Sequence, residues 1–291
     1  MTAERFIAPD AQGSPEVAAW YDDWQHLSHV ERFDARSRLD ARNLIRNYEA
    51  FNDVRLLKER LDPARSVDLV EVGCATGEFS RYLRLTFPQV CYTGLDVSEP
   101  AIARAKAKYP ETAFFVVEAG RPVAETLTHL GLSQHPALIY SKDVLQHQVE
   151  PLSFLSGLIR QASESVIVRC RTRDVGPTER DPERSCQHHY GGWMPYIVVN
   201  LQELINGILG EVPDGEVVVY RHHMVLGGSH NRFLPKELYL EETGTAETAV
   251  GIFKTTDRPG RVVIRDRSDG EFIGTWDYRI KRLAQKALGA L

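Results

Sequence analysis

The stretch of residues 67–98 constrains the fold of this chain more than any other. An apolar, β-branched run at 67–72 is followed by a turn of small residues and by a segment with apolar side chains at helical spacing. This order predicts a strand buried on both faces of a parallel sheet, a tight turn and a helix. A second apolar run ends at Asp96, nineteen residues after Gly77. A carboxylate in that place can accept hydrogen bonds from both hydroxyls of a ribose.

The turn between Gly73 and Gly77 lacks the features of a phosphate cradle. Counted from Gly73, the dinucleotide fingerprint G-x-G-x-x-G puts Glu78 where a small residue must pack. A carboxylate at the start of a helix would also repel a pyrophosphate. The region contains no G-x-x-x-x-G-K-[ST] sequence, so a P-loop is unsupported. The turn therefore favours a nucleoside ligand without a phosphate chain, such as adenosine that carries a sulfonium group.

Four motifs, in order and with suitable spacing, resemble those of class I S-adenosylmethionine-dependent methyltransferases over roughly residues 65–171. Residues 71–77 are similar to the first motif of the family, E/D-x-G-x-G-x-G, and Asp96 is similar to its ribose-binding acid. Residues 114–119 resemble the third strand with its acidic-Ala pair, which in the family reaches the adenine amino group. Residues 140–147 resemble the fourth-strand motif beneath the methionine end of the cofactor.

The resemblance implies a fold, a cofactor and a set of binding residues. The implied fold is a three-layer α/β/α Rossmann-like domain whose sheet is mostly parallel with an antiparallel last strand. The implied cofactor is S-adenosyl-L-methionine, with S-adenosyl-L-homocysteine as product. The chain departs from the family at Ala75, where the family has glycine, and at Lys142, where it often has a small polar residue. The implied cofactor-binding residues are Glu71, Gly73, Cys74, Ala75, Gly77, Asp96, Val97, Glu118, Ala119, Ser141 and Lys142.

Changes of pattern along the chain predict its organisation. Residues 1–64 are expected to form an N-terminal helical cap that closes over the cofactor, and residues 65–291 the methyltransferase core. The fifth strand is expected at 166–170. Residues 172–199 follow it at the carboxyl edge of the sheet and begin as a polar stretch with proline and glycine, which predicts an acceptor-side loop. Residues 279–291 have the apolar stripe of an amphipathic helix, for which docking on the body, a membrane surface and a dimer contact are alternatives.

Aromatic and histidine side chains near the cap and the acceptor-side loop are candidates for acceptor binding. Aromatic side chains present a large rigid surface with a polar tip, although they serve equally well to pack a helix on a sheet. The candidate substrate-binding residues are Tyr21, Trp24, His188, Tyr190 and Trp193.

Methyl transfer requires alignment of the acceptor with the methyl group and, for a hydroxyl, removal of a proton. Histidine is the first candidate for the base, because its ordinary pKa is near neutrality. His147 lies beside the predicted methyl site and His189 lies in the acceptor-side loop, so both are candidate catalytic residues. A structural histidine bonded to the backbone is the alternative for each. Cys186, His188 and His189 lack a fourth ligand and the spacing of a zinc site, so no metal is expected.

Composition and charge argue against several classes of protein and predict a cellular location. The chain has 291 residues, of which 43% are apolar, and its formal net charge is −5, which argues against a dedicated nucleic-acid binder. No apolar run approaches the roughly 20 residues of a membrane span. Four scattered cysteines and an N-terminus without an apolar signal predict reduced thiols and a cytoplasmic location. A homodimer is an open alternative.

These observations predict a methyltransferase that acts on a small-molecule acceptor, with a hydroxyl oxygen as the expected target. A natural product, a sugar or a glycan intermediate would suit the long acceptor-side loop. Residues 141–144, SKDV, do not resemble the N/D-P-P-Y/F/W motif of methylases that modify amino groups of DNA and protein. Macromolecular acceptors are therefore less favoured. Transfer to nitrogen or carbon is one alternative, and a methyltransferase-like binding protein without turnover is another.

Overall fold

The computed structural model describes most of the chain between residues 38 and 267. For residues 186–189 and 192–194 it describes the backbone alone. Tyr21, Tyr190 and the expected helix at 279–291 lie outside the described residues. The described residues are Trp24, Val30, Glu31, Asp34 and residues 38–180, 185–189, 192–223, 240, 244–254 and 256–267.

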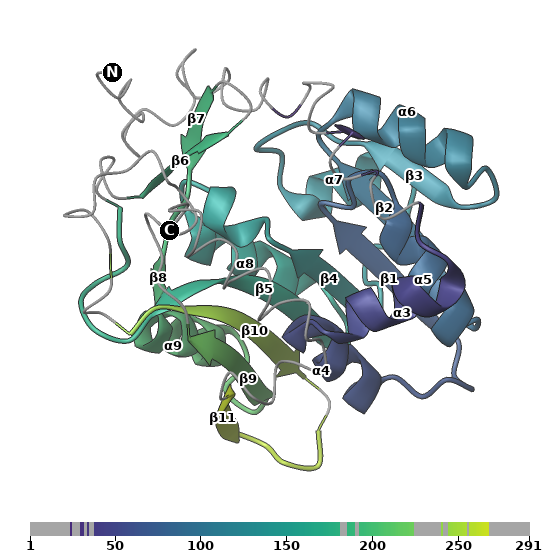
Figure 1. Ribbon diagram of the computed structural model, residues 1–291. Coiled ribbons are helices and arrows are strands. Elements are labelled where there is room, and N and C mark those ends of the chain that lie inside the picture. The colour runs from purple at the N-terminus through teal and green to yellow at the C-terminus, as the bar shows by residue number, and fades with distance from the viewer. Residues whose placement is uncertain are drawn as a thin grey trace.

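The described residues form a nine-stranded sheet with the order β11-β9-β10-β5-β4-β1-β2-β3, and β8 pairs with β5 beside this path (Figure 1). Strands β1 to β5 run parallel, whereas β10 is antiparallel to both of its neighbours. The strands are β1 Val67–Val72, β2 Val90–Asp96, β3 Ala113–Val116, β4 Leu138–Lys142, β5 Ser165–Arg173, β8 Val199–Asn200, β9 Glu216–His223, β10 Ala246–Phe253 and β11 Val262–Arg267.

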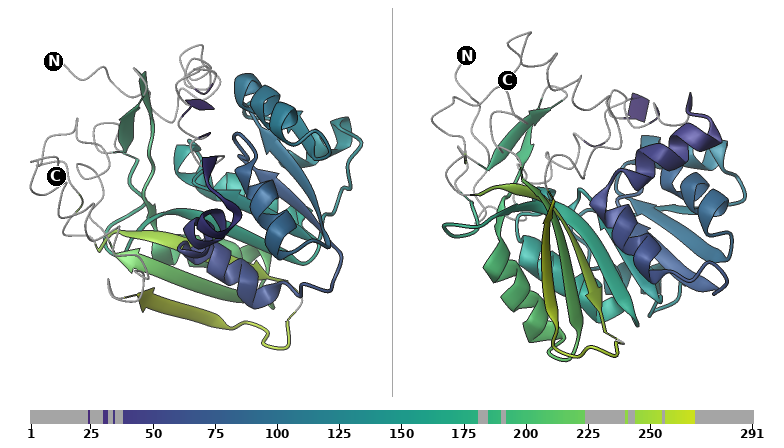
Figure 2. Two further views of the ribbon diagram at one scale, coloured as in Figure 1. Left: turned by 45° about the vertical axis from the view of Figure 1, so that its right-hand side comes forward. Right: turned by 60° about the horizontal axis from the view of Figure 1, so that its bottom comes forward.

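Helices cover both faces of the sheet, as the two views of Figure 2 show. Helices α3, α4 and α5 bury apolar side chains against one face, and α7, α8 and α9 against the other. Helix α6 packs on β2 and β3. These elements confirm the predicted Rossmann-like architecture. The helices are α3 Ala41–Glu49, α4 Asn52–Arg60, α5 Glu78–Thr86, α6 Glu99–Lys108, α7 Val123–His129, α8 Pro151–Gln161 and α9 Leu201–Glu211, with the 3-10 turn η4 Leu145–His147.

Three details differ from the sequence expectation. The expected antiparallel strand is β10, but β11 follows it and pairs parallel with β9 at the edge of the sheet. Strand β5 continues to Arg173, beyond the apolar run at 166–170, because β10 pairs with Arg171 and Thr172 and β8 pairs with Thr172 and Arg173. The acceptor-side loop contains a hairpin of β6, Cys186–His189, and β7, Gly192–Pro195. This hairpin pairs with none of the nine strands, so the main core imposes no apolar alternation on it.

Glycine is required at both ends of the turn after β1. Gly73 and Gly77 have φ values of 86° and 80°, a region that L-residues with a side chain rarely adopt. A Cβ atom on Gly77 would lie 2.6 Å from Cζ of Phe114, and one on Gly73 would lie 2.2 Å from Cγ2 of Val144. The two glycines therefore let Phe114 of β3 and Val144, which follows β4, pack closely against this turn.

Gly77→Ala should lower the free energy of unfolding by at least about 1 kcal/mol, because the left-handed conformation is costly for alanine and Phe114 must shift. Gly157→Ala is the matched control: Gly157 lies inside α8 with no atom within 4 Å of an added Cβ. It should raise the free energy of unfolding by about 0.5–1 kcal/mol through helix propensity. Urea unfolding of both variants measures the difference, and equal effects would contradict the packing described here.

Candidate active site

Asp96, the last residue of β2, is hydrogen-bonded to the turn that follows β1. Its Oδ2 accepts a hydrogen bond from the Ala75 N–H at 2.7 Å, and its Oδ1 accepts one from the Ser98 N–H at 2.8 Å. The N–H groups of Gly73 and Cys74 donate to the Leu95 carbonyl at 2.8 and 3.1 Å. Burial raises the pKa of Asp96, and the two N–H donors oppose that rise. Each carboxylate oxygen has a second lone pair, so the group can still accept from ribose hydroxyls.

Glu71, the acidic residue of the first motif, is buried under a tyrosine. The Tyr92 hydroxyl donates a hydrogen bond to Glu71 Oε2. Burial raises the pKa of Glu71 to about 8, although the Tyr92 bond and the charge of Lys142 lower it. Glu71 is therefore mostly protonated at neutral pH. Cys74 is also buried, and burial raises the pKa of its thiol, which makes it a packing residue without thiolate character.

Lys142 links the end of β4 to the α3–α4 corner. Its Nζ lies 3.5 Å from the centroid of the Phe51 ring and 5.3 Å from that of Tyr48. Cζ of Arg169 lies 4.5 Å from the Phe51 ring. Phe51 is the N-cap residue of α4 and attracts both cations through its aromatic face. The lysine that departs from the family pattern thus makes a contact with the expected cap.

The remaining predicted cofactor residues lie at the carboxyl ends of β2, β3 and β4. Ser141 is buried, and its hydroxyl donates to the Val72 carbonyl at 3.0 Å. Val97 directly follows Asp96, and the Val117 N–H donates to the Asp96 carbonyl at 2.9 Å. Glu118 and Ala119 come just after β3, where the exposed Glu118 carboxylate pairs with Arg121 at 2.5 Å. The structure therefore brings these residues to the edge of the sheet where the turn at 73–77 lies.

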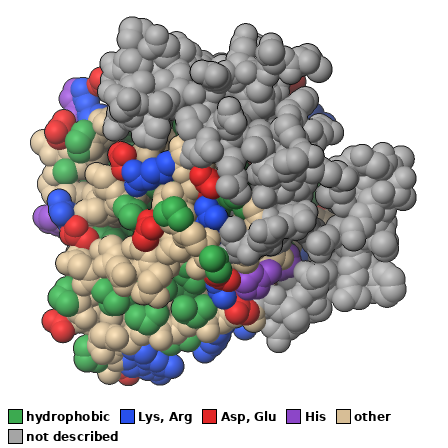
Figure 3. Space-filling model, turned by 90° about the vertical axis from the view of Figure 1, so that its left-hand side faces the viewer, with side chains coloured by type: hydrophobic (Ala, Val, Ile, Leu, Met, Phe, Trp, Pro, Cys, Tyr) green, Lys and Arg blue, Asp and Glu red, His purple; other side chains and the backbone are tan. Residues whose placement is uncertain are grey.

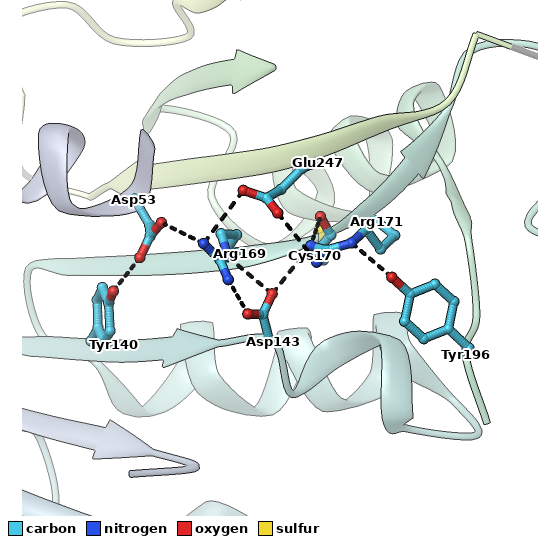
Figure 4. A network of polar contacts seen from close by, with 8 residues as sticks. All are labelled: Asp53, Tyr140, Asp143, Arg169, Cys170, Arg171, Tyr196 and Glu247. Atoms are coloured by element: carbon cyan, nitrogen blue, oxygen red, sulfur yellow. Dashed lines mark hydrogen bonds and ion pairs between the residues drawn. The ribbon is translucent and has the colours of Figure 1, made fainter. Parts of the chain in front are cut away.

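A network of five charged side chains, of which Asp53, Arg169 and Arg171 are buried, occupies the carboxyl ends of β4 and β5 (Figure 4). Arg169 donates from Nε to Asp143 Oδ1 at 2.9 Å and also bonds the second oxygen through Nη2. Its Nη1 lies 3.4 Å from Glu247 and 3.7 Å from Asp53. Arg171 Nη1 donates to Asp143 at 3.1 Å, and Nη2 lies 3.2 Å from Glu247. Asp143 therefore joins the two arginines.

The network also fixes the backbone after β4. Asp143 has a φ of 60°, and its N–H donates to the Arg169 carbonyl at 3.0 Å. Burial raises the pKa of Asp143, but the charges of Arg169 and Arg171 outweigh this and hold it well below its ordinary value. At the far end, the Tyr140 hydroxyl donates to Asp53. Sequence reasoning missed these residues, although arginine at every second position of a predicted buried strand signals buried ion pairs.

His147 lies directly beyond this network, at the end of η4. Its Nδ1 is 2.8 Å from the Pro195 carbonyl oxygen. The Trp24 ring lies edge-on to it with centroids 5.1 Å apart, and the Tyr196 ring lies at 5.9 Å. Burial, with a smaller contribution from the charge of Arg171, lowers the pKa of His147 to about 4, although the Pro195 bond and Asp143 oppose this shift. His147 is therefore a neutral imidazole at pH 7.

The predicted acceptor residues are only partly placed. Trp24 lies against His147, as a wall of the acceptor site would. His188 and His189 lie in β6 and Trp193 in β7, where the described backbone pairs His188 with Trp193. Within the described ranges, no group of three or more His, Cys, Asp or Glu residues could hold a metal ion.

The central part of the chain is similar to a known protein family. Residues 70–163 match the family model described as a methyltransferase domain. The chain carries a methyltransferase domain. This confirms the predicted enzyme class, an S-adenosylmethionine-dependent methyltransferase, and with it the predicted cofactor. No curated protein matches the sequence at a significant level.

Several solved structures share a general likeness with this methyltransferase. Magnesium protoporphyrin IX methyltransferase (ChlM) from Synechocystis PCC 6803 is 13% identical with a TM-score of 0.49, over 82% of this chain and 97% of that one. An O-methyltransferase of a Brevibacillus brevis trans-AT PKS multienzyme is 12% identical with a TM-score of 0.47, over 70% and 72%. The [4+2]-cyclase SpnF is 14% identical with a TM-score of 0.48, over 75% and 86%. At these values the likeness carries no conclusion about the acceptor.

On the described part of the face in Figure 3, basic and acidic side chains are interspersed, unlike the basic stripe of a nucleic-acid binder. None of the helices in the described ranges has both the length and the apolar character needed to cross a bilayer.

Asp96→Ala should weaken the binding of S-adenosylmethionine about 10- to 100-fold, which corresponds to the roughly 1.5–3 kcal/mol of a hydrogen bond to a charged group. Isothermal titration calorimetry measures this loss. Asp68→Ala is the control, because Asp68 is an exposed carboxylate in β1. Equal affinity of the two variants would contradict the ribose site.

Glu71→Gln should flatten the dependence of stability on pH. The carboxyl has an ordinary pKa of 4.5 when unfolded and about 8 when folded, so folding binds a proton between these pH values. The stability due to protonated Glu71 is complete below about pH 4.5 and is lost as the pH rises through 8. Between pH 5 and 8 the wild type should lose up to about 1.4 kcal/mol per pH unit more than the variant. Urea unfolding at several pH values measures this difference, and parallel curves would contradict the burial of Glu71.

Proposed function

We propose that this methyltransferase transfers the methyl group to a hydroxyl oxygen of a small-molecule acceptor, with His147 as the general base. A natural product, a sugar or a glycan intermediate is the proposed acceptor class. The observation that carries the proposal is the 2.8 Å contact between His147 Nδ1 and the Pro195 carbonyl. A carbonyl oxygen can only accept, so Nδ1 carries the proton of the neutral ring and Nε2 keeps a lone pair.

The chain offers the two things that methyl transfer to oxygen requires. Bound S-adenosylmethionine supplies a methyl group that its sulfonium has already activated. Asp96 and the turn at 73–77 hold the adenosine end, which leaves the carboxyl end of β4 for the methionine end. Nε2 of His147 would accept the proton of the acceptor hydroxyl when its oxygen takes the methyl group, and the methyl donor would leave as a neutral thioether that keeps the electron pair of the broken bond. Trp24 and Tyr196 flank the imidazole, with ring centroids 5.1 and 5.9 Å from that of His147.

The N-terminal segment up to residue 64 is the proposed cap of this site. Trp24 belongs to it and lies against His147, so closing the segment would complete the acceptor pocket around the base. His189 remains the second candidate base, and Tyr21, His188, Tyr190 and Trp193 remain proposed acceptor contacts.

His147→Asn should lower the rate of methyl transfer about 100- to 10,000-fold, the usual contribution of a general base. The asparagine amide can still donate to the Pro195 carbonyl but offers no base, so the affinity for S-adenosylmethionine should stay unchanged. A screen of hydroxyl, amine and carbon acceptors with a labelled methyl group identifies a substrate, and single turnovers measure the rate.

The pH profile and a second variant complete this test. Because burial lowers the pKa of His147 to about 4, the wild-type rate should show no fall near pH 6.5, where an ordinary histidine would become protonated. His189→Asn is the companion variant. If His147→Asn is fully active and His189→Asn is not, the base is His189. If both are fully active, or if amines are the only acceptors, the hydroxyl mechanism is wrong.

A further inference from the structure

Arg171 uses all three nitrogens of its guanidinium group on fixed partners. Nε donates to the Tyr196 hydroxyl oxygen at 2.9 Å, Nη1 donates to Asp143 at 3.1 Å and Nη2 lies 3.2 Å from Glu247 (Figure 4). The residue is only 6% exposed. Glu247 stands directly opposite Arg171 in the β5–β10 register, and Asp143 is held by Arg169 as well. The plane of this guanidinium is therefore fixed, in a way that the single ammonium of lysine cannot reproduce.

Tyr196 connects this fixed group to the turn that carries His147. Its hydroxyl is bound by Arg171, and its ring lies edge-on to the His147 ring. The residues on either side of it contact the same turn: the Pro195 carbonyl oxygen is 2.8 Å from His147 Nδ1, and the Ile197 N–H donates to the Gln146 carbonyl at 2.7 Å. Three consecutive residues thus pack against η4, and the middle one is tied to the sheet.

No carboxylate contacts the imidazole directly among the described residues. The two carboxylates nearest in sequence have other partners: Glu150 pairs with Arg180, and Asp143 pairs with both arginines. The tautomer of His147 therefore depends on a backbone carbonyl, and the place of that carbonyl depends on the segment around Tyr196. This is an indirect version of the arrangement in which a third group orients a catalytic base.

We propose that Arg171 is a positioning residue for the base: by holding the Tyr196 hydroxyl, it keeps the Pro195 carbonyl on Nδ1 of His147 and leaves Nε2 free to accept a proton. The inference rests on the proposed function for its catalytic meaning. The contacts themselves can be tested without any acceptor.

Nitrogen NMR of the full chain labelled with ¹⁵N-histidine provides the test, in the free form and with S-adenosylhomocysteine. His147→Asn assigns the His147 signals. The wild type should show the Nδ1–H tautomer alone at pH 7. Tyr196→Phe keeps the ring but removes the oxygen that Arg171 holds, and it should shift the His147 signals toward an average of the two tautomers. Arg171→Lys, which retains the charge, should cause the same shift.

Tyr140→Phe is the matched control, because it removes a buried hydroxyl from the Asp53 end of the same network and contacts nothing of the His147 turn. It should leave the His147 signals unchanged. With a substrate in hand, Tyr196→Phe should lower the rate of transfer by about 10- to 100-fold, as misplacement of a reacting group does, without weakening S-adenosylmethionine binding.

The outcomes separate this inference from the proposed function. If Tyr196→Phe leaves the His147 tautomer unchanged, or if Tyr140→Phe shifts it equally, Arg171 does not position the base and the inference is wrong. If the tautomer shifts but His147→Asn transfers methyl at the wild-type rate, the positioning of His147 is supported and its role as base is wrong.

Discussion

The arrangement of the carboxyl ends of β4 and β5 depends on the burial of two guanidinium groups on one face of β5. Arg169 and Arg171 are 4% and 6% exposed, and an unpaired charge at such a depth would cost several kcal/mol. Their carboxylate partners come from three other elements: Asp53 from α4, Asp143 from the end of β4 and Glu247 from β10. The pairs give little net stability compared with an apolar core, but they are satisfied only when all four elements take these places. The network therefore specifies where the fourth-strand motif ends and where α4 begins.

The parts of the fold that follow local patterns could be predicted from the sequence. Residues 67–98 have the strand, turn, helix and acid within a short span, so periodicity and glycine placement sufficed for β1, α5 and β2. The pairing of β11 with β9 and the extension of β5 to Arg173 depend on contacts between distant segments. Arginine at every second position signals buried ion pairs, but the pattern does not identify the carboxylate partners, which lie on distant segments. Asp53 and Arg169 are more than a hundred residues apart in the chain.

The residues of the candidate site show the same difference between local patterns and contacts of distant segments. Asp96 and the glycines of the first motif could be identified because their roles follow from spacing within one β-α-β unit. His147 could be named as a candidate from its place after β4, but its tautomer depends on Pro195, 48 residues further along. Tyr196 falls within the predicted acceptor-side loop at 172–199, and nothing local in the sequence connects it to Arg171. Positioning contacts of this kind are beyond sequence patterns because they join a loop to a strand through side-chain length and direction.

The network also limits which part of the proposed cap can move. Asp53 is fully buried and bound to Tyr140 and Arg169, and the Phe51 ring lies between Lys142 and Arg169. Val54, Leu56 and Leu57 of α4 are fully buried as well. Lifting α4 would expose this apolar surface and separate buried charges at once, which is far more costly than the closing of a loop. Leu44 and Tyr48 of α3 are buried in the same apolar cluster, so α3 and the start of α4 form a fixed part of the proposed cap.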